Sequence, residues 1–101
     1  MHFVVSWDIH AQGAKWTEVN NQLQACLAPY SWVKPLNTLY VVQVASQVAG
    51  DHIVSMLTRT AQSAAVTGVS VHFLATPLMS GGRYQGFLSQ EAWNAVNERS
   101  V

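Results

Sequence analysis

The sequence predicts one small α+β domain in which two helices cover one face of a four-stranded antiparallel sheet. Three observations predict it. The chain has 101 residues and half of them are hydrophobic, which suits a single domain with its own core, since domains typically span ~50–250 residues. The hydrophobic periodicity changes in the order strand, helix, strand, strand, helix, strand. The two central strands are joined by too few residues for anything but a hairpin.

The first strand and the first helix are read from a change in period. The stretch His2–Asp8 is dense in β-forming residues and alternates between two faces. A loop containing Gly13 follows, and the region Ala14–Ala28 then repeats its apolar residues at three- and four-residue spacing, which indicates a helix that Pro29 ends. The predicted core stripe of this helix consists of Trp16, Val19, Leu23, Cys26 and Leu27.

A hairpin is predicted next, with strands at Trp32–Leu36 and Thr38–Ala45. Pro35 lacks an amide hydrogen and cannot donate to a sheet ladder. We therefore expect the first strand of the pair to lie at an edge of the sheet or to be irregular at Pro35.

The second helix and the last core strand follow the hairpin. Residues 46–50 predict a turn with helix-start signals, and Asp51 is the expected N-cap of a helix that ends near Ser63. The final strand, Gly68–Ala75, alternates so that His72 lies on the face opposite to Val71.

This order of elements is that of a ferredoxin-like βαββαβ sandwich. Residues 1–75 form the predicted ferredoxin-like core, and residues 76–101 form a C-terminal extension. Within the extension we expect a short edge strand at Arg83–Leu88 and a short helix capped by Ser89, available for dimer or partner contact. Because both core helices cover one face of the sheet, the other face is left open, and a second subunit is its expected cover.

Charge and composition restrict the partners. Charged residues make up only 10% of the chain, against a typical ~25%, so a homodimer that buries neutral surface is expected. The net charge is zero and the five cations are scattered. A nucleic-acid partner is therefore not supported by charge, since such binding usually leaves a basic patch.

Compartment and redox chemistry are also constrained. The lone cysteine, Cys26, excludes an intrachain disulfide and a cysteine-based metal site, and we expect it to be buried. No apolar run approaches the ~20 residues of a membrane span, and the opening residues lack the basic start of a signal peptide. A cytoplasmic location without membrane association is the expectation.

The opening residues Phe3-Val4-Val5-Ser6-Trp7-Asp8-Ile9 carry a family resemblance. A hydrophobic strand ending in Ser-aromatic-Asp-hydrophobic is similar to the start of the CRISPR-associated Cas-two family. It is still more similar to short stand-alone relatives of that family, most of them uncharacterised. Gly13, Trp16 and the Trp-containing hairpin Ser31–Val42 continue the similarity, which covers residues 1–75.

The resemblance implies a homodimer in which Asp8 faces the Asp8 of the second subunit across the dyad. The two carboxylates would bind a divalent metal such as Mg²⁺, and the dimer would cleave RNA or DNA as an endonuclease. Two close carboxylates repel one another, and a divalent cation relieves that repulsion while activating a water. His10 could join the metal site or act as a general base near neutral pH. Gln12 and Lys15 stand where several family members carry arginines, so we expect weaker binding of the phosphate backbone.

Three alternatives remain open at this point. Asp8 could instead accept hydrogen bonds from loop amides, as Asp often does at strand ends. The chain could be a non-catalytic protein-interaction module of a toxin–antitoxin or mobile-element system. It could also enclose a small-molecule pocket between the sheet and the helices, as other dimeric ferredoxin-like domains do.

Overall fold

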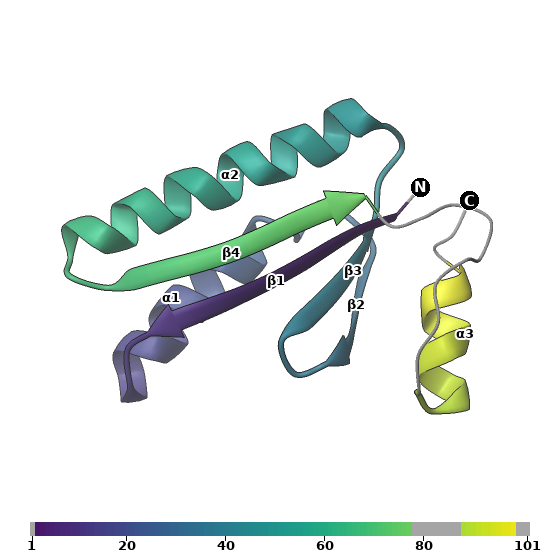
Figure 1. Ribbon diagram of the computed structural model, residues 1–101, viewed down its shortest axis with the longest axis horizontal. Coiled ribbons are helices and arrows are strands. Elements are labelled where there is room, and N and C mark those ends of the chain that lie inside the picture. The colour runs from purple at the N-terminus through teal and green to yellow at the C-terminus, as the bar shows by residue number, and fades with distance from the viewer. Residues whose placement is uncertain (1, 78–87, 99–101) are drawn as a thin grey trace.

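The chain alternates strands and helices in the predicted order and ends in a further helix (Figure 1). The computed structural model describes residues 2–77 and 88–98. The elements are β1 (His2–His10), α1 (Gly13–Ala25), β2 (Trp32–Leu36), β3 (Leu39–Gln43), α2 (Gln47–Val66), β4 (Ser70–Pro77) and α3 (Gln90–Glu98). The edge strand predicted for 83–88 lies outside the described residues apart from its last position.

The four strands form one antiparallel sheet in the order β2-β3-β1-β4, so the predicted antiparallel α+β architecture is confirmed. β1 lies inside the sheet and has β3 and β4 as neighbours. Its pairing with β3 stops at Ser6, whereas its pairing with β4 continues to His10. The last four residues of β1 therefore have a strand on one side only.

The first strand of the hairpin is an irregular edge strand, as Pro35 predicts. β2 lies at an edge of the sheet, and its register against β3 shifts between Val33 and Leu36, on either side of Pro35. A residue without an amide hydrogen interrupts the ladder at that point.

The core lies between one face of the sheet and the helices α1 and α2. The β1 side chains Phe3, Val5 and Trp7 alternate onto this face and are buried. They belong to one cluster with Leu23 of α1 and Leu57 of α2. Among the described helices, none combines the length and the apolar character needed to cross a membrane.

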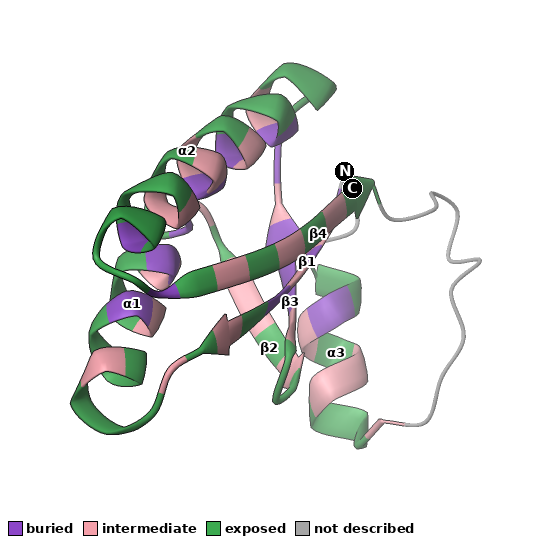
Figure 2. Cartoon of the chain, turned by 60° about the vertical axis from the view of Figure 1, so that its left-hand side comes forward, coloured by how far each residue is buried: buried purple, intermediate pink, exposed green. Residues whose placement is uncertain are grey.

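The other face of the sheet was expected to be open, and this is only partly correct. α3 lies on the side of the sheet away from α1 and α2, next to β2 (Figure 2). Ring atom Nε2 of buried His2 lies 2.8 Å from the carbonyl oxygen of Val96, which is also buried. The chain's own C-terminal helix thus covers the β2 end of this face, and the part formed by β4 and the end of β1 stays exposed.

The second helix starts earlier and ends later than the sequence predicts. Ser46 is its N-cap, with an extended backbone and a side-chain oxygen that accepts a hydrogen bond from the amide of Ala49 at 3.3 Å. The predicted cap Asp51 lies inside the helix. The predicted turn at 46–50 is wrong because Gly50, which reads as a breaker, is buried within the helix. The helix ends after Val66, two residues before Gly68, whose positive φ of 87° favours glycine.

The two candidate caps make a testable contrast. Ser46→Ala should lower the free energy of unfolding by about 1 kcal/mol, because an amide at the start of α2 loses its acceptor. Asp51→Ala should change it by less than about 0.5 kcal/mol, as is usual for exposed surface sites. Equilibrium urea unfolding of both variants measures the difference, and a larger loss from Asp51→Ala would contradict this helix start.

Candidate functional site

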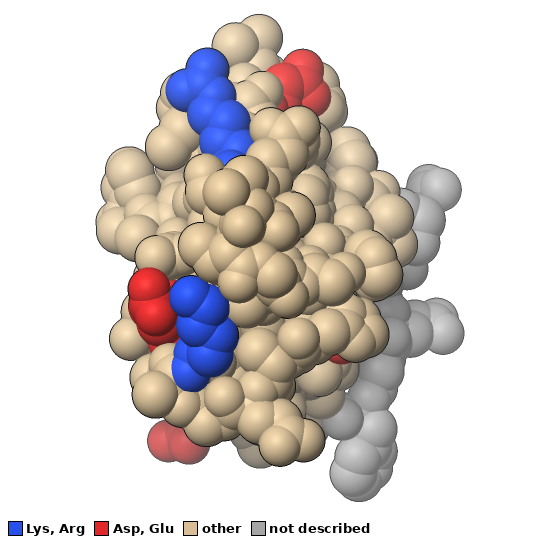
Figure 3. Space-filling view, turned by 90° about the vertical axis from the view of Figure 1, so that its left-hand side faces the viewer, with Lys and Arg blue, Asp and Glu red and all other residues tan. Residues whose placement is uncertain are grey.

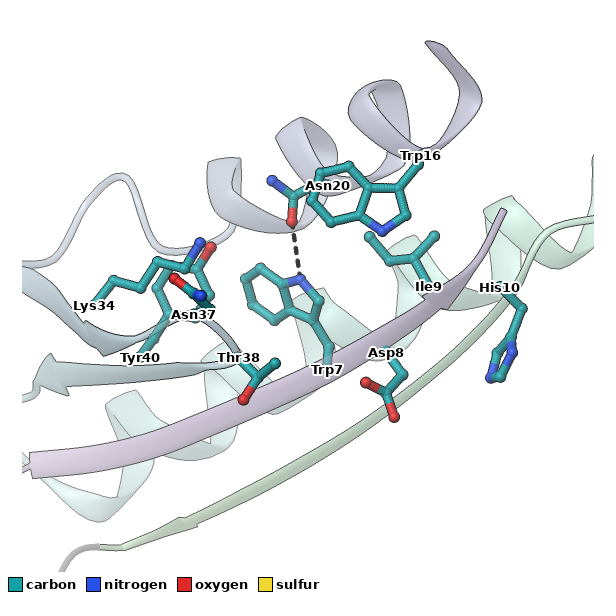
Figure 4. A pocket seen from close by; sticks show the side chains of 10 residues that line it. All are labelled: Trp7, Asp8, Ile9, His10, Trp16, Asn20, Lys34, Asn37, Thr38 and Tyr40. Atoms are coloured by element: carbon teal, nitrogen blue, oxygen red, sulfur yellow. Dashed lines mark hydrogen bonds between the residues drawn. The ribbon is translucent and has the colours of Figure 1, made fainter. Parts of the chain in front are cut away.

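Asp8 lies within β1, two residues before the strand ends, and its side chain is exposed. Figure 4 shows its carboxylate on the side of β1 away from the indole of Trp7. It therefore points to the sheet face opposite α1 and α2. No described residue donates a hydrogen bond to this carboxylate or forms an ion pair with it, so the structure offers no support for Asp8 as an anchor of loop amides.

Two histidines lie beside Asp8 on the same face. His72 of β4 is its direct partner across the antiparallel pair, and His10 follows two residues later on β1. The imidazole centroids of His10 and His72 are 5.2 Å apart, with ring planes at 71°. All three side chains are exposed. We call Asp8, His10 and His72 the Asp8 patch.

The sequence predicts only part of this patch. Alternation in the last strand places His72 on the correct face, away from the core, and this is confirmed. Its position directly opposite Asp8 depends on the register between β1 and β4, two strands that are distant in the sequence. The pair could have been predicted by assuming that the two strands are antiparallel and that the end of β1 lies opposite the start of β4.

One chain does not supply a complete metal site among its described residues. Within 2–77 and 88–98, no group of three or more His, Cys, Asp or Glu side chains is arranged to hold a metal ion. Mg²⁺ typically takes one or two protein carboxylates and keeps several waters. The Asp8 patch offers one carboxylate and two imidazoles.

A cavity of about 350 Å³ opens beside the same stretch of β1, at the point where β3 has ended. Its walls come from β1, α1 and the β2–β3 hairpin (Figure 4). Trp7 forms part of the wall. Its indole stacks on the ring of Tyr40 at a centroid distance of 4.4 Å, and its Nε1–H donates to Oδ1 of Asn20 at 3.1 Å.

Trp16 differs from its prediction. It was expected in the core stripe of the first helix, yet 40% of it is exposed and it lines the cavity. The stripe does continue into the core through Val19, Leu23, Cys26 and Leu27, which are all buried. Trp16 departs from the stripe because it lies in the first turn of α1, beside Ile9 at the cavity (Figure 4).

The surface around these features carries little charge. Figure 3 shows a mostly uncharged face on which Lys and Arg side chains lie apart from one another, with acidic side chains nearby. In the described part of the chain the only ion pair is Lys15–Glu18, 3.9 Å long and exposed. Among the described residues that line the cavity, Lys34 is the one Lys or Arg, and its Nζ lies 5.5 Å from the centroid of the Tyr40 ring.

No protein-family model matches the chain, and no curated protein or solved structure is significantly similar to it. The function is therefore argued from the geometry above.

Proposed function

We propose that the chain is a homodimeric, divalent-metal-dependent endonuclease acting on RNA or DNA, in which Asp8 of each copy contributes one carboxylate. The observation that carries this proposal is the state of Asp8. Its carboxylate is exposed, has no hydrogen-bond or ion-pair partner among the described residues, and lies beside two exposed histidines. It occupies the part of the sheet that α3 leaves uncovered.

The sheet supports the ferredoxin-like assignment within this proposal. Read from the other edge, its strand order is β4-β1-β3-β2, with α1 and α2 on one face. A hairpin between two strand–helix units produces this order in a split βαβ arrangement. In such a sheet β1 is central, and Asp8 lies near its end, on the part of the face that β1 and β4 form.

The surface properties support self-association. Only 10% of the residues are charged, and Leu74, on the same face as Asp8, is 73% exposed. Burying such side chains against a second copy gains about 25 cal/mol for each Å² of apolar surface removed from water. A dyad near Ser6 and Leu74 would bring the two Asp8 side chains towards each other.

The Asp8 patch has the residue types that phosphodiester hydrolysis needs. When bound between two copies, a divalent cation would supply charge neutralisation and an activated water. Asp8 would hold that cation and orient its waters. His72, the cross-strand neighbour of Asp8, can accept a proton from the attacking water or return one to the leaving oxygen.

Metal dependence tests the proposal on the unmodified protein. Labelled single-stranded RNA and duplex DNA should be cleaved with Mg²⁺ or Mn²⁺, not in EDTA, and again after excess metal is restored. Light scattering should give the mass of a dimer under the same conditions. A stable dimer that cleaves neither substrate with either metal would refute the nuclease.

One observation favours a second candidate, the non-catalytic protein-interaction module. β1 and β4 contain no Lys or Arg, and the described cations lie on α1, β2 and α2. The Asp8 patch therefore has no neighbouring cation on its own strands to hold a phosphate. A dimer that lacks cleavage but captures a defined protein partner, with Leu74→Glu abolishing capture, would support this candidate.

A further inference from the structure

We propose that the cavity beside the last four residues of β1 is a binding site for one nucleotide, with the base against Trp16 and the phosphate at Lys34. Asp8 borders this cavity, but its carboxylate lies on the side of β1 away from the Trp7 indole (Figure 4). The nucleotide site goes beyond the proposed cleavage because binding here requires neither a metal nor a second chain.

The position of the cavity follows from the unequal pairing of β1. β3 leaves β1 after the pair Ser6–Leu39, while β4 accompanies it to His10. The space that a longer β3 would fill is bounded instead by α1 and by the tip of the β2–β3 hairpin. Its volume of about 350 Å³ lies at the lower end of the ~300–1,000 Å³ typical of small-molecule sites. One nucleotide suits this size better than a dinucleotide cofactor.

The aromatic wall of the cavity has a fixed part and an accessible part. Trp7 is buried and held by both Tyr40 and Asn20. The phenol of Tyr40 accepts a hydrogen bond from Nε2 of Gln24 at 2.8 Å, which fixes the ring beneath it. Trp16 is 40% exposed beside this wall. A base stacked on an exposed aromatic ring typically gains about 1–3 kcal/mol.

The polar groups of the cavity match a base and an anion. Lys34 has no carboxylate within ion-pair distance among the described residues, and its ammonium is held over Tyr40. Asn20 uses only its oxygen to bind Trp7, so its amide hydrogens remain for a ligand. Asn37, exposed at the hairpin tip, offers a second amide. An amide presents both a donor and an acceptor, as the edge of a base does.

The charges also orient the ligand. Among the described residues that line the cavity, Asp8 is the only carboxylate and Lys34 the only ammonium. Figure 4 shows Lys34 and Asp8 on different sides of Trp7, with Trp16 above Ile9. A phosphate is attracted to Lys34 and repelled by Asp8, so the phosphate lies at the hairpin and the base extends towards α1.

Titration with mononucleotides in EDTA tests the site separately from any cleavage. AMP, GMP, CMP and UMP are added in turn while tryptophan fluorescence and calorimetric heat are followed. We expect saturable binding of one nucleotide per chain, and weaker binding of the matching nucleosides. A second arm compares a short oligonucleotide with and without its 5′-phosphate, which distinguishes a free nucleotide from the end of a strand as the natural source.

Matched variants locate the binding. Trp16→Ala should weaken it roughly 5- to 150-fold, the equivalent of the stacking energy, and Trp16→Tyr should largely restore it. Lys34→Met should weaken the binding of nucleotides more than the binding of nucleosides. Lys15→Met is the control, because Lys15 is paired with Glu18 and lies outside the cavity wall. These side chains are exposed or at the surface, and circular dichroism will verify that each variant is folded.

Two results would overturn the site. One is the absence of saturable binding by every mononucleotide and by the phosphorylated oligonucleotide. The other is an equal loss from Lys34→Met and Lys15→Met, which indicates non-specific attraction. Because all titrations contain EDTA, a failed cleavage assay leaves this result unaffected, and a failed titration leaves the metal-dependent assay unaffected.

Discussion

Asp8→Asn should reduce metal-dependent cleavage about a hundredfold or more, the scale on which removal of one catalytic group acts, without loss of stability. The carboxylate is exposed and no described residue pairs with it, so replacing it with the amide of asparagine removes no contact within the chain. In a dimer that brings two Asp8 side chains together, the substitution also removes their mutual repulsion. The variant should therefore dimerise more tightly than the wild type in EDTA, and less tightly with Mg²⁺.

Asp51→Asn is the matched control for this prediction. Asp51 is an exposed carboxylate on α2, where its Oδ1 accepts a hydrogen bond from Nε2 of Gln47 at 3.0 Å. Asp51→Asn makes the same change of charge on α2, on the helical side of the sheet, so cleavage and the metal dependence of dimerisation should stay as in the wild type. Cleavage that persists in a clean preparation of Asp8→Asn would remove Asp8 from the mechanism.

The order of elements was predictable because each element carries its own period, and alternation even placed His72 on the correct face. Helix ends were less predictable because they depend on single contacts. Asp51 and Ser46 are both good caps by type, and only the hydrogen bond from the amide of Ala49 selects Ser46. Gly50 reads as a turn residue because nothing local reveals that it packs against β1.

The site was less predictable than the fold because it depends on where strands end relative to one another. Asp8 is visible in the sequence as an acidic residue near the end of an apolar strand. The cavity exists because β3 begins only at Leu39, opposite Ser6, while β1 continues to His10 beside β4, a difference set by the register of two separate pairings. The same geometry moves Trp16 from a predicted core position to the cavity wall. The contact between His2 and Val96, 94 positions apart, likewise has no local signal.

Gly50→Ala should destabilise the fold by about 1–3 kcal/mol, the usual cost of overpacking a core. In an ordinary helix interior the same change stabilises by roughly 0.5–1 kcal/mol, because glycine has the greater conformational freedom to lose. Here a Cβ at position 50 would lie 2.7 Å from Cδ1 of Phe3, and closer still to Cε1 and Cζ of the same ring. Phe3 is only 2% exposed, so its ring has no free space into which to turn.

Thermal and urea unfolding measure this effect, and in a domain of this size 1 kcal/mol shifts Tm by roughly 4–8 °C. Ser55→Ala, at an exposed position of α2, is the control and should be neutral or slightly stabilising. Phe3→Leu opens space for the new methyl group, so the double variant Phe3→Leu, Gly50→Ala should lose less than the two single losses combined. Strictly additive losses in the free energy of unfolding would show that Phe3 and position 50 are not in contact. Subadditive losses would establish that Gly50 is what lets α2 approach β1 closely, and β1 is the strand that carries Asp8 and the cavity.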